Sequence, residues 1–160
     1  MATGTPATLA LAAAGVEFTL HRYQHDPAST DFGHEAAAGL RVDEMQIFKT
    51  LVVDIGVSKP QLCVGVVPVA GMLDLKAIAA VLGAKRAVLA DPKAAAASSG
   101  YIVGGISPIA QKNKLPTVID ETAQLFDTIF VSAGKRGLQV ELSPANLAEI
   151  TTARFADIAR

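Results

Sequence analysis

The segment IFKTLVVDI occupies residues 47–55, and it is followed by GVSKP at 56–60 and by QLCVGVV at 61–67. The two outer stretches are rich in Val, Ile and Leu, which favour strands, whereas Gly and Pro in the middle stretch are typical of a turn. Two such strands separated by a short turn predict an antiparallel hairpin. This hairpin is the clearest local signal in the chain, and the other elements are placed around it.

Capping residues mark the starts of the predicted helices. Thr5-Pro6, Asp74, Asp91-Pro92 and Ser143-Pro144 each put a capping side chain before a helical segment. The predicted helices cover 7–14, 33–40 and 74–82, and two more begin at 91 and 143. Further strands are predicted at 17–23, 101–103, 117–119, 128–132 and 138–142. Strands outnumber helices and several are consecutive, so we predict one α+β domain over 1–160 with a mixed or antiparallel sheet.

The composition narrows the class of function. Hydrophobic residues make up 51% of the 160 residues, which predicts a folded domain and not a disordered chain. The formal net charge is -1 and Trp is absent, which argues against a broad basic or aromatic face for nucleic acid. The composition does not exclude a small local basic patch that binds nucleic acid. Its candidates are Lys112, Lys114, Lys135 and Arg136.

Cysteine usage and hydropathy indicate a cytoplasmic protein. Cys63 is the single cysteine, so no intramolecular disulfide can form and a reducing compartment fits. The apolar stretch 9–14 is not preceded by the Lys or Arg of a signal peptide. No apolar run approaches the roughly 20 residues that a membrane-spanning helix needs, so no membrane partner is expected.

Lys49 is the first candidate for chemistry. Alternate residues of a strand share a face, so Lys49 shares an apolar face with Ile47 and Leu51. Buried lysines are rare and often functional, because an ammonium group on such a face is partly removed from water. The alternative is an edge lysine whose stem packs on the sheet while its ammonium group reaches water.

The second candidate is Gly104-Gly105-Ile106-Ser107-Pro108. Adjacent glycines allow a ligand to approach the backbone closely, and the amides of such a loop can stabilise an oxyanion or bind a carbonyl. The segment lacks both phosphate-binding patterns, GxGxxG and GxxxxGK[ST]. The alternative is a tight turn with only a structural role.

Other catalytic chemistries find little support. His21 and His25 are separated by three residues, but no CxxC pair exists to complete a metal site, so neither a metal nor another cofactor is expected. No GxSxG motif is present, and Cys63 lies in an apolar strand, which predicts an inert thiol.

Together these features resemble the YbaK/EbsC family of aminoacyl-tRNA deacylases. The matching segments, in the family's order and nearly from end to end, are HRYQHDP at 21–27, FG at 32–33, FKTL at 48–51, LDLK at 73–76, GYIVGGISP at 100–108 and GKRG at 134–137. The similarity is greatest to members that act on cysteinyl-tRNA(Pro).

The resemblance implies a mixed sheet curled toward a barrel with flanking helices, related to the editing insertion of bacterial prolyl-tRNA synthetases. It implies hydrolysis of the ester between cysteine and the 3′ end of a proline tRNA, in trans and beside prolyl-tRNA synthetase. It gives catalytic roles to Lys49 and Gly104. The substrate-binding residues that it implies are Tyr23, Phe32, Thr50, Gly105, Ile106, Ser107, Pro108 and Ser132. Ala133 and Gln139 depart from the residues that relatives often have, which affects the pocket wall.

Several alternatives stay open. The substrate is cysteinyl-tRNA(Pro) or another small aminoacyl-tRNA, such as an alanyl or seryl ester, because one methylene changes binding by only about 1–3 kcal/mol. A non-catalytic module that binds a synthetase or tRNA is a different class of function, and the presence of both Lys49 and the glycine loop argues against it. The attacking nucleophile is the substrate's own thiol or a water molecule.

Overall fold

The computed structural model describes residues 4–160, which form five α-helices, a 3₁₀ turn and eight strands. The helices are α1 (Pro6–Ala13), α2 (Phe32–Leu40), α3 (Leu75–Val81), α4 (Pro92–Ser99) and α5 (Pro144–Thr151), and the 3₁₀ turn is η1 (Glu121–Leu125). The strands are β1 (Thr19–Arg22), β2 (Phe48–Asp54), β3 (Leu62–Pro68), β4 (Val88–Leu89), β5 (Thr117–Asp120), β6 (Ile129–Lys135), β7 (Leu138–Leu142) and β8 (Arg154–Ala156).

The predicted hairpin is confirmed at the centre of the fold. β2 and β3 pair antiparallel along their full length, from Phe48 opposite Pro68 to Asp54 opposite Leu62. The Asp54 carboxylate closes the turn, because it accepts hydrogen bonds from the amides of Gly56 at 2.9 Å and Gln61 at 3.0 Å. These bonds fix the register of the hairpin that carries Lys49.

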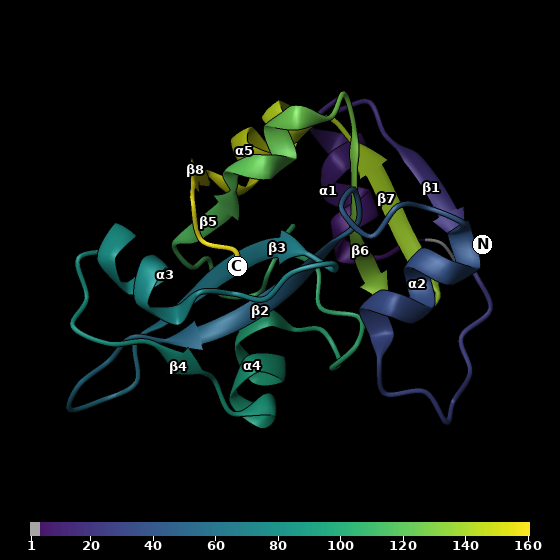
Figure 1. Ribbon diagram of the computed structural model, residues 1–160. Helices are drawn as coiled ribbons and strands as arrows, with labels where there is room; N and C mark the ends of the chain where they lie inside the picture. The colour runs from purple at the N-terminus through teal and green to yellow at the C-terminus, as the bar shows by residue number, and fades with distance from the viewer. Residues whose placement is uncertain (1–3) are drawn as a thin grey trace.

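The strands form two sheets. One has the order β4-β2-β3-β5-β8, in which β5 and β8 run parallel to their neighbours, and the other has the order β1-β7-β6. Figure 1 shows the smaller sheet and α2 on the right, α3 on the left, and the β2–β3 hairpin between them. The α+β class with mixed pairing is therefore confirmed.

The mixed sheet, expected to curl toward a barrel, is divided into two sheets that stay open. Among residues 4–160 the two sheets are joined by one β-bridge, between Ile47 and Phe130, and they do not close into a barrel. Next to this bridge, the Phe130 amide donates to the Gln46 carbonyl at 3.1 Å. The two sheets therefore meet just before Lys49, which leaves room between them beyond the junction.

The predicted helix starts are confirmed, whereas one predicted strand is wrong. The side chains of Thr5, Asp74, Asp91 and Ser143 each accept a hydrogen bond from an amide in the first turn of their helix. Residues 101–103 form a turn instead of a strand. Tyr101 is buried and donates its hydroxyl to the Ile109 carbonyl at 2.7 Å, whereas Ile102 and Val103 face outward.

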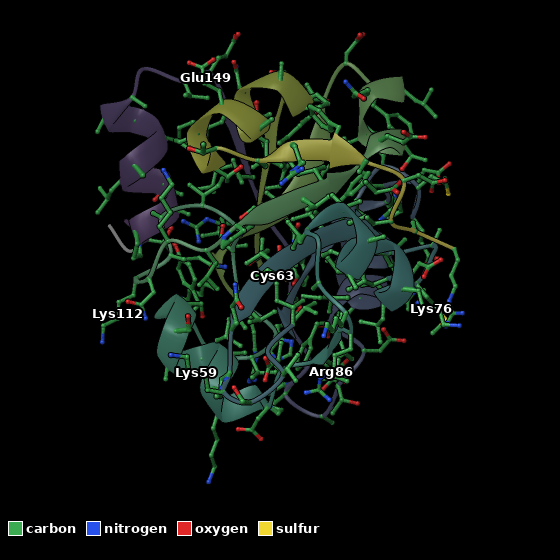
Figure 2. All side chains as sticks on the ribbon, turned by 90° about the vertical axis from the view of Figure 1, so that its left-hand side faces the viewer. Lys59, Cys63, Lys76, Arg86, Lys112 and Glu149 are labelled. Carbon is green, nitrogen blue, oxygen red and sulfur yellow. The ribbon has the colours of Figure 1, made fainter. Side chains whose placement is uncertain are left out.

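Apolar clusters hold the two sheets. The largest joins α1 and α5 to residues of both sheets, and a second surrounds Cys63 with Val53, Val118 and Ile158. Figure 2 shows Cys63 inside the molecule, with Lys76 and Lys112 at its edges. Burial raises the pKa of the Cys63 thiol to about 11, as expected for an inert buried thiol. No helix among the described residues is long and apolar enough to cross a membrane.

Candidate active site

A pocket of about 340 Å³ opens between the two sheets. Strand β2 and the start of α2 line it, together with the glycine loop (residues 104–108) and Val103 before it. The β4–α4 segment adds Leu89, Ala90, Pro92 and Ala95, and further lining residues are Val69 after β3, Ser132 of β6 and Gln139 of β7. Residues of this lining that the argument uses are Asp31, Phe32, Lys49, Thr50, Gly104, Ile106, Ser132 and Gln139. The topology thus brings together six of the residues predicted for the site: Phe32, Lys49, Thr50, Gly104, Ile106 and Ser132.

Strand β2 supplies Lys49 to the pocket. Its neighbours on the same face behave as predicted, because Ile47 is buried and Leu51 is half-buried against apolar clusters. Lys49 itself is half-buried. Among residues 4–160 no carboxylate forms an ion pair with Lys49, since the ion pairs found there are all between His and Glu. The ammonium group is therefore available to a ligand.

The start of α2 supplies Asp31 and Phe32. Asp31 occupies the N-cap position, yet its side chain makes no capping hydrogen bond. Asp31 and Lys49 are the two charged side chains of the pocket lining. Sequence reasoning missed Asp31, although its place directly before the Phe32-Gly33 segment was a usable signal. Gly33 lets α2 approach β3's end closely, because a Cβ there would lie 2.8 Å from a methyl group of Val69.

The glycine loop presents free amides at the pocket. Gly104 has φ +88°, which favours glycine, and an added Cβ would lie 2.7 Å from the Phe32 ring and 2.8 Å from Arg136 Nε. The Gly105 amide is already used, because it donates to the Ile102 carbonyl at 2.9 Å. The amides of Gly104 and Ile106 donate no hydrogen bond within residues 4–160. These two N–H groups are the loop's candidates for an oxyanion.

The opposite wall, from β6 and β7, is polar and uncharged. Ser132 Oγ accepts a hydrogen bond from the Gly134 amide at 3.1 Å. Gln139 is 7% exposed, and its Oε1 has no hydrogen-bond partner within the described chain. The same holds for Thr50 Oγ1 on β2. Buried polar atoms without partners are uncommon, so these two are the candidates in the pocket lining to bind donors of a polar ligand.

Four residues predicted for the site do not line the pocket. Gly105 and Ser107 are buried in the loop, where Ser107 Oγ accepts a hydrogen bond from the Ile109 amide at 3.2 Å. Pro108 lines a separate cavity of about 140 Å³. Tyr23 packs against α2 at Gly39. Tyr23 is linked to the pocket through Gln139, because the two side chains interact. Burial raises the pKa of Tyr23.

The histidines are engaged in pairs with glutamates. His25 Nδ1 lies 2.7 Å from Glu35 Oε1, and this hydrogen bond lowers the pKa of Glu35. His34 Nδ1 lies 2.6 Å from Glu44 Oε2, which raises the pKa of His34. None of these four residues lines the pocket. Within residues 4–160 no group of three or more His, Cys, Asp or Glu side chains is arranged to hold a metal ion.

Comparison with known proteins decides the family. The family model of the aminoacyl-tRNA editing domain matches residues 26–150, which contain every lining residue named above. The chain belongs to this family. The editing domain is 43% identical over 122 residues to EbsC of Enterococcus faecalis (strain ATCC 700802 / V583), a protein proposed to be a Cys-tRNA(Pro)/Cys-tRNA(Cys) deacylase. The match covers 76% of this chain and 73% of that relative.

Solved structures share the fold of the editing domain over its whole length. A protein described as hypothetical superimposes with a TM-score of 0.85 and 27% identity, over 98% of this chain and 100% of that one. A protein proposed to be a trans-editing enzyme for prolyl tRNA synthetase superimposes with a TM-score of 0.84 over 100% of this chain and 98% of that one. At 24% identity, this second likeness shows the fold alone.

Proposed function

We propose that this editing domain hydrolyses cysteinyl-tRNA(Pro) in trans, with Lys49 and the glycine loop as its catalytic groups. One observation carries the proposal: the pocket combines an unpaired ammonium group, free loop amides and two buried polar atoms without partners. An aminoacyl ester of a ribose carries the complementary groups, namely carbonyl and ribose oxygens, a hydroxyl and an α-ammonium group. The name of the EbsC relative supports the cysteinyl specificity.

In this mechanism the protein stabilises charge and orients the ester. Attack on the ester carbon converts the carbonyl oxygen into an oxyanion, which the amides of Gly104 and Ile106 bind. Preorganised donors of this kind typically accelerate acyl transfer about 10²–10³-fold each. Lys49 binds the ester carbonyl or the adjoining ribose oxygen and adds a positive charge. The C–O bond then breaks, and the 3′ oxygen of the tRNA leaves with a proton.

The substrate's α-ammonium group needs hydrogen-bond acceptors, and each wall of the pocket offers one: Gln139 on β7 and Thr50 on β2. Gln139 Oε1 and Thr50 Oγ1 are both buried, and each has a lone pair without a partner in the described chain. An ammonium group has three donors, so it can bind both atoms. Asp31 adds a negative charge at the pocket lining. Gln139 therefore offers a hydrogen-bond acceptor without adding a charge.

The nucleophile comes from outside the protein. Cys63 is fully buried and does not line the pocket, and Ser132 has no histidine partner in the described structure. Two nucleophiles fit the proposal. The substrate's thiol, ordinarily with a pKa near 8.5, can close on its own carbonyl to a four-membered thioester ring that water then opens. A water molecule held over the ester is the other, and it avoids the ring strain.

A panel of mischarged tRNAs tests the proposal. Purified protein is mixed with cysteinyl-, seryl- and alanyl-tRNA(Pro) and with cysteinyl-tRNA(Cys), and loss of the ester is followed. We expect cysteinyl-tRNA(Pro) to be hydrolysed at least about tenfold faster than the alanyl ester, as one missing polar group in a small pocket implies. Turnover of none of these esters, with intact fold, contradicts the deacylase proposal.

The same panel separates the two nucleophiles. Serine is nearly isosteric with cysteine, but its hydroxyl hardly ionises at neutral pH. If the thiol attacks, the seryl ester is bound but hydrolysed far more slowly. Equal rates for cysteinyl and seryl esters on the same tRNA identify water as the nucleophile.

Prolyl-tRNA synthetase is the proposed partner, and the cytoplasm, where tRNAs are charged, is the proposed location. The net charge of -1 predicts weak affinity for free tRNA. Docking beside the synthetase raises the effective concentration of the mischarged end. We expect micromolar or weaker binding of uncharged tRNA alone, and a ternary complex when the synthetase is added. Salt-insensitive nanomolar binding of naked tRNA contradicts this part of the proposal.

A further inference from the structure

Arg136 is held at the rim of the pocket by two contacts. Its Nε donates a hydrogen bond to the Val103 carbonyl at 2.8 Å, and its guanidinium carbon lies 4.9 Å from the centroid of the Phe32 ring. Val103 and Phe32 both line the pocket, and Arg136 Nε also lies next to Gly104. The guanidinium group therefore lies where the glycine loop and the start of α2 meet.

The backbone on either side of Arg136 is also fixed. Arg136 lies in the β6–β7 hairpin between Gly134 and Gly137, which have φ +100° and +86°. The Gly137 carbonyl accepts a hydrogen bond from the Tyr23 amide at 3.0 Å. The hairpin also packs against the glycine loop so closely that a Cβ at Gly105 would lie 3.0 Å from the Arg136 amide nitrogen. An exposed arginine normally samples many rotamers, whereas this one is oriented before any ligand binds.

The positive charge of Arg136 has no counterion in the described chain. The ion pairs within residues 4–160 are three His–Glu pairs, and none involves Arg136. A guanidinium group has five N–H donors, of which Arg136 uses one, on Nε. The four donors on its two terminal nitrogens remain. Their planar arrangement matches two oxygens of a phosphate or carboxylate.

We infer that Arg136 binds a backbone phosphate of the substrate, the one on the 5′ side of the terminal adenosine. This inference rests on the proposed function. The carboxyl group of the amino acid is consumed in the ester, so the anion nearest to the reacting bond is that phosphate. The pocket of about 340 Å³ accommodates the aminoacyl group and the adjoining ribose, and the phosphate then lies outside, at the rim. Arg136 is thus a positioning residue that sets the depth to which the 3′ end enters.

Substrates with and without the phosphate test this role. The esters are cysteinyl-tRNA(Pro) and 3′-O-cysteinyl adenosine, which lacks every phosphate. For Arg136→Gln we expect kcat/KM on the tRNA ester to fall about tenfold or more, mainly through KM, as loss of one charge-assisted phosphate contact implies. On the adenosine ester the loss should be several-fold smaller. The dependence of log KM on log salt should weaken by about 0.7 for the tRNA ester.

A binding measurement without catalysis gives a second readout. Adenosine and adenosine 5′-monophosphate are used as competitive inhibitors of the adenosine ester. The unmodified protein should bind the monophosphate more tightly than adenosine, and Arg136→Gln should remove that difference. Arg136→Lys keeps the charge but lacks the planar fork, so it should restore the preference only in part.

A matched control removes one positive charge elsewhere. Lys76 is exposed on α3, a helix that contributes nothing to the pocket lining, and Figure 2 shows it at the edge of the molecule. Lys76→Gln should leave both esters and both inhibitors unaffected. Equal losses on both esters for Arg136→Gln overturn the inference and assign Arg136 to holding Phe32 and the glycine loop. Inactivity of the unmodified protein on both esters refutes the proposed function itself, which is a distinguishable outcome.

Discussion

The two walls of the pocket differ in chemistry. The wall from β2 is an apolar strand interrupted by Lys49 and Thr50, and it belongs to the rigid β2–β3 hairpin. The wall from β6 and β7 presents Ser132 and Gln139, which are polar but uncharged. Because a charge acts most strongly on a reaction that develops the opposite charge, the β2 wall is suited to catalysis. The neutral wall is suited to recognition, where hydrogen-bond geometry discriminates between ligands.

The largest effect is expected from removing the charge of the β2 wall. Lys49→Ala should lower kcat for cysteinyl-tRNA(Pro) by a factor on the order of 10² or more, similar to loss of one oxyanion donor. The melting temperature should change little, because Lys49 has no ion-pair partner in the described chain to lose. Deacylation rates and thermal melts measure both. Lys76→Ala, an exposed lysine away from the pocket, is the control. Near-normal turnover of Lys49→Ala would remove the distinction between the walls.

The glycine loop closes the pocket between the two walls, and it should give the next largest effect. Gly104→Ala places a Cβ at φ +88° against Phe32 and Arg136, so we expect kcat/KM to fall about tenfold or more. Gly83 is a matched control, because it has φ +69° with nothing within 4 Å of an added Cβ. Both substitutions incur a similar backbone strain, of roughly 1–2 kcal/mol. Both should lower the melting temperature, but only Gly104→Ala should lower activity per folded molecule. Equal activity of the two variants assigns the loop a structural role.

The contrast between the walls also shows what the sequence could predict. Helix caps at Thr5, Asp74, Asp91 and Ser143 were predictable because capping is a local interaction of a side chain with the next turn. The β2–β3 hairpin was predictable for the same reason. Strands β4 and β8 were not predicted, because each has only two or three residues. Tertiary contacts, and not the intrinsic propensity of the residues, decide whether such short segments form strands. The segment 101–103 has strand-forming residues, yet tertiary contacts bury Tyr101 and leave Ile102 and Val103 exposed.

For the site, too, local features were predictable from the sequence and contacts between distant segments were not. Lys49 was singled out from strand periodicity alone, and Gly104 from its doubled glycine. Phe32, Thr50, Ile106 and Ser132 came only through the family resemblance. Asp31 and Arg136 acquire their significance from contacts between segments up to about a hundred residues apart, namely the start of α2, the glycine loop and the β6–β7 hairpin. No local pattern encodes such contacts.

A substitution of Thr50 is expected to have a smaller effect, in which stability is kept or increased while substrate binding is weakened. Its hydroxyl is buried without a partner in the described chain, so Thr50→Val removes an unsatisfied polar atom while keeping the shape of the side chain. We expect the free energy of unfolding to stay equal or to rise by up to about 1 kcal/mol, and KM for the cysteinyl ester to rise several-fold. Urea unfolding and steady-state kinetics measure the two quantities. A destabilised variant with unchanged KM would show that the hydroxyl has a structural partner and no role in recognition.

The smallest effect on activity is expected behind the β2 wall, at Cys63. This thiol lies in β3, fully buried among Val53, Val118 and Ile158, and it does not line the pocket. Cys63→Ser should therefore leave the deacylation rate per folded molecule unchanged. The fold should lose about 1–3 kcal/mol, because a hydroxyl is placed in an apolar cluster.

The ionisation of Cys63 gives the same distinction a second test. Burial raises its pKa from 9.0 to about 11, so the folded state disfavours the thiolate. Below pH 9, the pKa of the unfolded thiol, the ionisation of Cys63 does not affect stability. Between pH 9 and about 11 the unfolded thiol loses its proton while the folded one keeps it, so the protein becomes progressively less stable as the pH rises. At pH 8 a thiol reagent should modify the native protein only as fast as it unfolds, and urea should accelerate the modification. If the native thiol reacts rapidly at pH 8, or if Cys63→Ser abolishes turnover while the fold persists, then β3 carries a nucleophile. In that case the β2–β3 hairpin would supply both the nucleophile and the charge, and the contrast between the two walls would not describe the catalytic site.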